Sequence, residues 1–167
     1  MSDNLKVLHV LPTLKKDGAE VQFANLLMEI KNTEIDIFTF DLYEKGDSIR
    51  PMLKNNDLFF KNSVFYLKKI INENNYDIVH SHLPKADLLV GLLSVFNKKF
   101  KHIISVHAKY GTRKEESKIK YLFSNFFWKR ILNNSSGVIA ISKSIYYWLV
   151  EEKHIDHNLI KTIYYGV

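Results

Sequence analysis

Cysteine is absent from the 167-residue sequence, and glycine and proline are scarce, with six and three residues. Without cysteine the chain has no disulfide framework, no thiolate metal site and no cysteine nucleophile, and a reducing cytoplasm is its simplest setting. The hydrophobic content of 46% argues against a disordered chain. We expect one packed domain over residues 1–167, an ordinary length for a single core.

Long hydrophobic runs are also absent. The opening MSDNLKVLHVLP lacks the basic leader and the extended apolar stretch of a signal peptide. The longest apolar run elsewhere, Leu88 to Phe96, is much shorter than the roughly 20 residues that span a bilayer. The sequence therefore predicts a cytoplasmic protein that is soluble or peripheral on the inner face of the membrane.

Positive charge is concentrated in one segment. Residues 97–130 carry ten Lys and Arg against two Asp and Glu, a net charge of +8, although the whole chain carries only +6. A local basic patch attracts polyanions, and the candidates are a phosphorylated substrate, anionic lipid or nucleic acid. Aromatic residues interleave with these lysines, but no recognised nucleic-acid motif accompanies them, so we expect no nucleic-acid partner.

Short apolar runs alternate with segments of helical periodicity along the whole chain. This alternation is typical of right-handed β-α-β crossovers and predicts an α/β, doubly wound, mostly parallel, Rossmann-like sheet. The expected strands are Leu5–Leu11, Ile35–Leu42, Tyr76–His80, His102–His107, Gly137–Ile141 and Leu159–Tyr164. The first expected helix begins at a capping box formed by Asp17 and Glu20. The other expected helices are Ser63–Asn72, Ala86–Phe96, Glu115–Leu132 and Ser142–Glu151.

Ligands of open parallel sheets bind beyond the carboxyl ends of the strands. The loop after the first strand ends at Gly18, which would let a ligand approach the backbone closely. Lys15 and Lys16 place two positive charges beside the next helix, and this arrangement favours an anion. The alternative is an ordinary turn with a solvated lysine pair.

Histidines end two of the expected strands. His80 and His82 stand two residues apart and therefore face the same way on a strand, and His107 ends the next strand. These three side chains could form a zinc site. The neighbouring sequence offers no clear second shell of hydrogen-bonding partners, so we expect no metal. A histidine at a strand end is more often structural than catalytic.

Five segments carry a resemblance to a known family. In order and spacing they are similar to the amino-terminal domain of family 4 retaining glycosyltransferases, and together they cover nearly the whole chain. They read VLHVLPTLKKDGAE, DIVHSHLPKADLLVGLL, HIISVHAKYG, GVIAISKSI and IKTIYYGV. The resemblance implies the GT-B architecture, in which two Rossmann-like domains face each other across a cleft.

The resemblance also implies how the work is divided between the two domains. The second domain chiefly holds the nucleotide-sugar, which is a donor substrate and not a cofactor, and the reaction needs no metal. The first domain, which this chain resembles, mainly binds a glycan or lipid-linked acceptor. The groups that neutralise the leaving diphosphate belong to the second domain, so we expect this chain alone to be inactive.

Individual positions follow from the motifs. His107 matches the histidine that contacts the transferred sugar and is the expected catalytic residue, and Gly18 belongs to the loop near the donor phosphates. Ser142 matches the serine that opens the helix after the AIS strand. The full expected substrate-binding set is Gly18, Lys15, Lys16, His82, Lys109 and Ser142.

The sequence departs from the family pattern in two segments. Lys15, Lys16 and Asp17 stand where the family often carries glycines, which alters the expected diphosphate contact. Tyr165 replaces the asparagine of the closing NG pair, although Gly166 is kept. Two alternatives to an enzyme half stay open. One is a binding module, either non-catalytic or completed as a subunit by a separate donor-binding chain, and the second is an unrelated nucleotide-binding domain. The second lacks support because GxGxxG and P-loop patterns are absent.

The basic stretch from Lys109 to Arg130 mixes lysines with aromatic side chains. Lysines attract anionic head groups and aromatic rings settle at the membrane interface, and several enzymes that this chain resembles dock on membranes through this region. Helices of such a fold must also cover the sheet, so we expect most of these aromatics to be packed inside. The excess charge still predicts weak, salt-sensitive binding to an anionic membrane surface.

Overall fold

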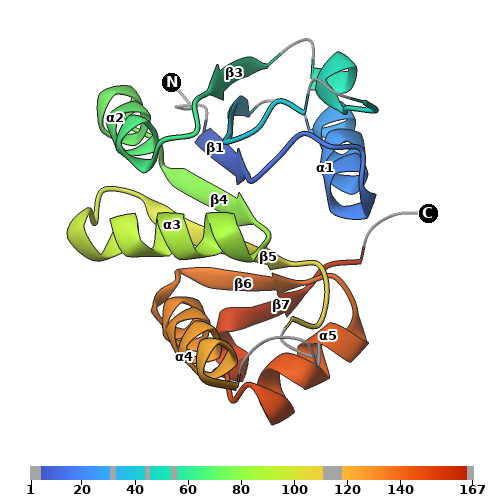
Figure 1. Cartoon of the computed structure of the whole chain (residues 1–167), viewed down its shortest axis with the longest axis vertical. Helices are drawn as coiled ribbons and strands as arrows, with labels where there is room; N and C mark the ends of the chain where they lie inside the picture. The colour runs from blue at the N-terminus through green and yellow to red at the C-terminus, as the bar shows by residue number, and fades with distance from the viewer. Residues whose placement is uncertain (1–4, 31–32, 44–45, 54–55, 111–117, 165–167) are drawn as a thin grey trace.

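A computed structural model describes residues 5–30, 33–43, 46–53, 56–110 and 118–164, with side-chain detail outside 118–125. Its centre is a seven-stranded sheet in the order β3-β2-β1-β4-β5-β6-β7, and every pair of neighbouring strands is parallel (Figure 1). The strands are β1 (Lys6–Leu11), β2 (Glu34–Thr39), β3 (Asp57–Phe60), β4 (Ile78–His82), β5 (Lys101–Val106), β6 (Gly137–Ala140) and β7 (Ile160–Thr162). The predicted parallel α/β fold is confirmed.

Helices connect successive strands and cover the sheet. The α-helices are α1 (Gly18–Glu29), α2 (Val64–Asn74), α3 (Pro84–Phe96), α4 (Lys118–Asn134) and α5 (Lys143–Tyr147). Shorter turns are the 3₁₀ segments η1 (Arg50–Leu53) and η3 (His157–Leu159) and the π-helical η2 (Trp148–Glu152). In the described part of the chain, no helix has both the length and the apolar character needed to cross a membrane.

Three local predictions were wrong. The strand β3 was missed, because its four residues are only partly buried and it pairs with β2 alone at the sheet edge. The expected strand Tyr76–His80 begins at Ile78 and continues to His82. Asp17 precedes α1, but its side chain makes no capping hydrogen bond. Its carboxylate pairs instead with Lys15, at 3.0 Å.

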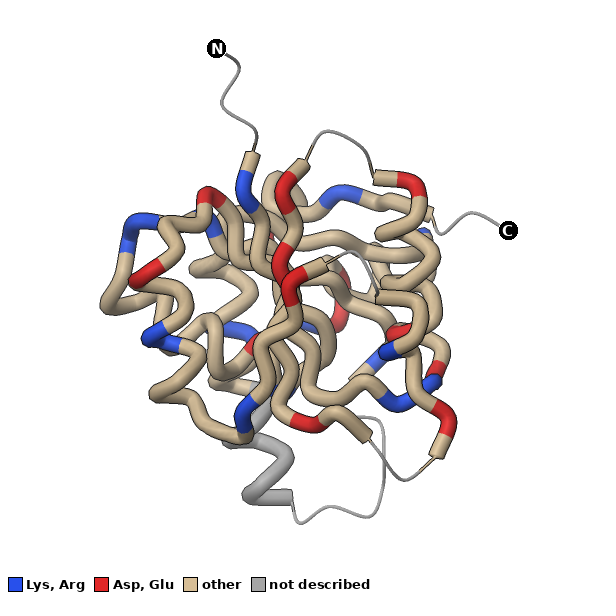
Figure 2. The backbone as a smooth tube through the Cα atoms, turned by 90° about the horizontal axis from the view of Figure 1, so that it is seen from above, with Lys and Arg blue, Asp and Glu red and all other residues tan. Residues whose placement is uncertain are grey.

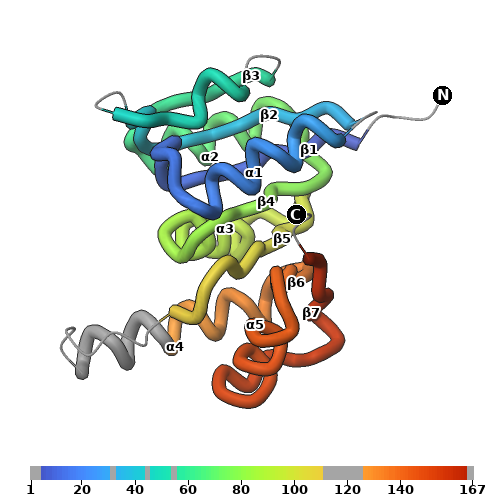
Figure 3. Tube along the Cα trace, turned by 90° about the vertical axis from the view of Figure 1, so that its right-hand side faces the viewer, coloured from blue at the N-terminus to red at the C-terminus, as the bar shows by residue number. Residues whose placement is uncertain are grey.

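The two faces of the sheet are covered unequally. Side chains of α2 and α3 pack over β1, β2 and β4, and those of α4 and α5 pack over β5 and β6. On the opposite face α1 and η1 cover β1 and β2, with Phe23 and Leu53 in that cluster. Figure 3 shows α1 beside the β1 and β2 end of the sheet, far along the molecule from α4 and α5. The second face from β4 to β7 is therefore the thinly covered part of the described fold.

The basic stretch only partly follows the expected packing. Trp128 of α4 is buried, but Phe126 and Phe127 are exposed, so the prediction that these two face the sheet was wrong. Arg113 and Lys114, and the side chains of Lys118, Lys120, Tyr121 and Phe123, lie outside the described residues. Elsewhere, Lys and Arg are interspersed with Asp and Glu along the described chain (Figure 2).

Candidate functional site

The carboxyl ends of β1, β4, β5 and β6 lie along one edge of the sheet, because all four strands are parallel. The loop that ends at Gly18 follows β1, His82 ends β4, and His107 follows β5. Ser142 follows β6 in the same way. The structure thus places the sequence-predicted residues on a common edge, with His82 and His107 in direct contact.

A histidine that sequence reasoning missed completes the centre of this edge. His9 of β1 lies in register with His80 of β4, and side-chain alternation puts His9, His80 and His82 on one face of the sheet. The ring centroids of His80 and His82 are 4.3 Å apart, and those of His9 and His80 are 4.9 Å apart. The one local sign of this role is that the polar His9 stands between apolar residues in the strand sequence LHVL.

Hydrogen bonds join these rings into a row. Nδ1 of His9 lies 3.0 Å from Nε2 of His82, and Nδ1 of His82 lies 3.2 Å from Nε2 of His107. His80 lies beside this row, because its Nε2 bonds the Ser105 hydroxyl at 2.8 Å. Phe23 of α1 packs on His9 and His82, with ring centroids 4.9 and 5.1 Å away.

Burial keeps the imidazoles of this row neutral. It lowers the pKa of His9 to about 3 and the pKa of His107 to about 4. The pKa values of His80 and His82 are also well below the usual range, first because of burial and then because the neighbouring histidines repel a further positive charge. At neutral pH this site therefore offers hydrogen-bonding nitrogens and no positive charge.

Besides forming hydrogen bonds, neutral imidazoles can bind a metal ion. His9, His80 and His82 each offer one nitrogen, and the three nitrogens lie within 4.8 Å of one another. This set differs from the zinc set considered from the sequence, because His9 takes the place of His107. No carboxylate belongs to the set, and His9 and His82 already bond each other. The expectation of no metal stays a prediction.

The lysine loop after β1 is open to a ligand. Lys15 is half-exposed and its ammonium is partly balanced by Asp17, whereas Lys16 is exposed. A Cβ atom added at Gly18 would meet nothing within 4 Å, so packing does not require a glycine there. The structure therefore leaves space beside the start of α1, and the anion-binding role of this loop stays a prediction.

The structure shows a structural role for Ser142 but not for Lys109. Lys109 is exposed near the end of β5. The hydroxyl of Ser142 accepts a hydrogen bond from the backbone N–H of Ile145, at 3.2 Å, and so caps α5. This cap explains a serine at the position without any ligand, and the substrate contacts of both residues stay predictions.

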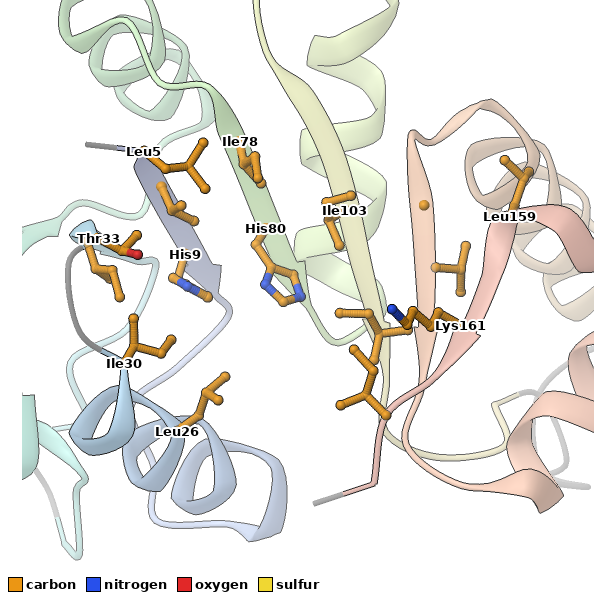
Figure 4. Close-up of a pocket in the computed structure, with 16 residues that line it drawn as sticks. Leu5, His9, Leu26, Ile30, Thr33, Ile78, His80, Ile103, Leu159 and Lys161 are labelled. Carbon is orange, nitrogen blue, oxygen red and sulfur yellow. The ribbon is translucent and has the colours of Figure 1, made fainter. Parts of the chain in front are cut away.

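An apolar groove of about 500 Å³ opens on the thinly covered face of the sheet. Figure 4 shows His9 and His80 between side chains of α1 on one side and those of β5 to β7 on the other. Leu26 comes from α1, Ile30 directly follows that helix, and Ile103 comes from β5. The histidine row is thus reached from the groove at His9 and from the sheet edge at His107.

A second polar cluster lies on the opposite face of β4. The hydroxyl of Ser81 donates to Asp87 at 2.7 Å and lies 2.9 Å from Nε2 of His102. The indole N–H of Trp128 donates to the other carboxylate oxygen of Asp87, at 3.4 Å. Burial raises the pKa of Asp87 to about 7. Sequence reasoning missed this cluster, since Asp87 looks like an ordinary acidic residue in the first turn of a helix.

Comparison with known protein families identifies the family of this chain. The model of Glycosyltransferase Family 4 matches residues 7–167. An uncharacterized glycosyltransferase of Methanocaldococcus jannaschii is 27% identical over 161 residues, covering 90% of this chain and 43% of that protein. The chain thus spans less than half the length of this relative.

Solved structures agree in fold. Alr3699/HepE of Anabaena, in complex with UDP-glucose, has a TM-score of 0.77 at 18% identity, with 98% of this chain and 44% of that chain covered. The lipopolysaccharide outer core galactosyltransferase WaaB has a TM-score of 0.71 at 18% identity, with 98% and 46% covered. At such identities these two structures show the fold alone.

Proposed function

Because this chain belongs to glycosyltransferase family 4, we propose that it is the acceptor-side half of an enzyme that transfers a hexose from a nucleotide-sugar. The acceptor is a glycan or a lipid-linked sugar, and the configuration of the transferred sugar is retained. The observation that carries the proposal is the neutral His107, held by His82 at the carboxyl edge of the sheet. The binding of UDP-glucose by the Anabaena protein supports a nucleotide-sugar donor.

A neutral imidazole suits the contact that His107 would make. Its nitrogens can donate one hydrogen bond and accept another, which matches the hydroxyl groups of a sugar. A charged imidazolium at this position would instead attract the diphosphate. Lys15 and Lys16, beside the start of α1, are better placed to meet an anionic phosphate.

Replacement of His107 by alanine tests the proposal. In an enzyme that contains both domains, His107→Ala should lower sugar transfer about 100-fold, as expected for an orienting and proton-sharing group. The melting temperature should fall only slightly, because His107 is partly buried and its hydrogen bond to the buried His82 is lost. His157→Ala, at an exposed histidine of η3, should leave transfer unchanged. Undiminished transfer by His107→Ala would sink the assignment.

We further propose that the donor site needs residues beyond this chain. The chain covers less than half of its relatives, and leaving of the nucleotide requires groups that neutralise the diphosphate. The 167 residues alone should therefore bind common nucleotide-sugars poorly and show no transfer. Calorimetric titration measures this directly, and micromolar affinity would place the donor site within the chain.

A membrane surface is the proposed setting for a lipid-linked acceptor. The outer side of α3 exposes Leu88, Leu92, Val95 and Phe96 at helical spacing, and Lys98 and Lys99 follow directly. Such a mixture suits contact with anionic lipids. Co-sedimentation with anionic vesicles should be weak, and raising the salt concentration should abolish it.

Charge reversal at Lys118, Lys120, Lys129 and Arg130 should remove this vesicle binding. Reversal of Lys143 and Lys161, which lie outside the basic stretch, is the matched control and should have a smaller effect. Absence of binding at low salt would end the membrane proposal and leave the proposed transferase activity untouched.

A further inference from the structure

We propose that His9, His82 and His107 form one hydrogen-bonded chain whose three rings must share the same tautomer, so that His9 and His82 are positioning residues for His107. The geometry behind this is the pair of contacts between Nδ1 of one ring and Nε2 of the next, at 3.0 and 3.2 Å. The coupling between tautomers can be tested on these 167 residues alone, whereas its effect on sugar transfer rests on the proposed function.

The coupling follows from the chemistry of neutral imidazole. Each neutral ring carries one N–H, which donates, and one bare nitrogen, which accepts. His9, His82 and His107 are all neutral at pH 7, since burial lowers the pKa of each ring. A hydrogen bond between two such rings therefore needs the proton on one facing nitrogen and a lone pair on the other.

Only two arrangements satisfy both contacts. In one, Nδ1–H of His9 donates to His82 and Nδ1–H of His82 donates to His107, so Nδ1 of His107 carries the third proton. In the other, Nε2–H of His107 donates to His82 and Nε2–H of His82 donates to His9, so Nε2 of His9 carries the third proton. A mixed set of tautomers would leave two protons, or two lone pairs, facing each other within 3.2 Å.

The surroundings of His9 favour the arrangement with all protons on Nδ1. In the described part of the chain, no hydrogen bond is formed by Nε2 of His9, and the ring lines the apolar groove (Figure 4). An N–H without an acceptor in such surroundings is rarer and more costly than an unused lone pair. We therefore expect Nε2 of His9 to be bare, which puts the proton of His107 on Nδ1.

This arrangement gives His107 a defined hydrogen-bonding character. Its Nε2 accepts from His82, so its remaining nitrogen is a donor, suited to an oxygen lone pair of a hydroxyl or carbonyl group. His9, which sits deep in the sheet next to the groove, thereby fixes what a residue at the sheet edge can donate. His82 transmits this choice, because each of its two nitrogens bonds one neighbour.

Nitrogen NMR of the protein labelled with ¹⁵N in its histidines tests the proposal at neutral pH. Long-range proton–nitrogen correlation spectra identify which ring nitrogen carries the proton. His9, His82 and His107 should all be in the Nδ1–H form, which is the minor form of free histidine. Different tautomers among the three rings, or an Nε2–H form of all three, would overturn the assignment without the need for any variant.

Two matched variants test the coupling itself. His9→Phe keeps an aromatic ring against Phe23 but removes the donor, so His107 should change to a mixture of tautomers. His80→Phe is the control. His80 is also buried and packs on His82, but its own hydrogen bond goes to Ser105 and not to the three hydrogen-bonded histidines. This variant should leave His107 in the Nδ1–H form. An unchanged tautomer of His107 in His9→Phe would contradict the coupling.

Kinetics of the two-domain enzyme then separate this inference from the proposed function. His9→Phe should lower kcat about tenfold, the rate equivalent of one hydrogen bond, with little change in KM. His157→Ala, at an exposed histidine of η3 outside the site, should change neither. An enzyme that transfers no sugar at all would refute the proposed function. The NMR spectra would still decide whether the three tautomers are coupled.

Discussion

Strand β4 carries a polar cluster on each of its faces, and the two clusters are built differently. His80 and His82 point toward the groove beside His9, whereas Ser81, between them in sequence, points under α3 and α4 toward Asp87. The groove cluster contains imidazoles and no carboxylate. The helix-covered cluster contains a carboxyl group that two donors satisfy. Alternation of side chains along one strand thus separates two polar environments that are adjacent in sequence.

Asp87 and the histidines of the groove cluster respond to pH in opposite directions. The pKa of Asp87 is raised from 3.8 to about 7, so its stabilising contribution is complete below about pH 4 and is lost as the pH rises through 7. The pKa values of His9 and His107 are lowered from 6.5 to about 3 and 4. Their contributions are complete above pH 6.5 and are lost as the pH falls through these values. Below pH 6.5 the several histidines outweigh the one carboxyl, and the free energy of unfolding should fall.

The largest expected difference between the two faces appears at neighbouring residues of β5. Ile104 is fully buried under the helices, so Ile104→Ala should lower the free energy of unfolding by about 2–5 kcal/mol. Ile103, on the groove face, is only partly buried, and Ile103→Ala should cost about 1 kcal/mol. Chemical denaturation measures both. Equal costs would show that the groove face is as well covered as the helix face.

The next effect isolates the carboxyl of the helix-covered cluster. Asp87→Asn removes the titration, so the stability of the variant relative to the parent protein should rise with pH from 5 to 7, by about 1 kcal/mol per pH unit. Ser81→Ala is the control, because it breaks the 2.7 Å hydrogen bond but keeps the buried carboxyl and its pH dependence. Parallel stability curves for Asp87→Asn and the parent protein would mean that Asp87 is ionised throughout this range.

The smallest effect compares two glycines, one on each side of the sheet. A Cβ atom at Gly91 of α3 would overlap with Cγ2 of Ile131 of α4, so Gly91→Ala should cost about 1–2 kcal/mol after the gain in helix propensity. Gly18→Ala at the start of α1 meets open space and should be neutral or slightly stabilising. Thermal unfolding distinguishes them. Recovery of stability in Gly91→Ala combined with Ile131→Ala would confirm that the α3–α4 contact is the cause.

Much of the fold could be predicted because it depends on local pattern. Strand-length apolar runs between helical segments predicted the parallel sheet, and the rule for strand ends in such a sheet put His82, His107 and Ser142 on its carboxyl edge. The capping of α2 by Ser63 and of α5 by Ser142 also depends on nearby residues only. Strand β3 could not be predicted in this way, because a four-residue edge strand buries too few side chains to produce a clear hydrophobic pattern.

The sequence by itself determined the alternation of strands and helices, the family and the edge on which polar residues gather. Only the tertiary structure decided that His9 meets His82. These residues are 73 positions apart, and the register between β1 and β4 that brings them together is specified by no local pattern. The burial of Asp87 beside Trp128 was decided in the same way, by the packing of α4 on α3. Periodicity gives the face of a strand or helix on which a residue lies, whereas long-range packing decides which side chains share that face.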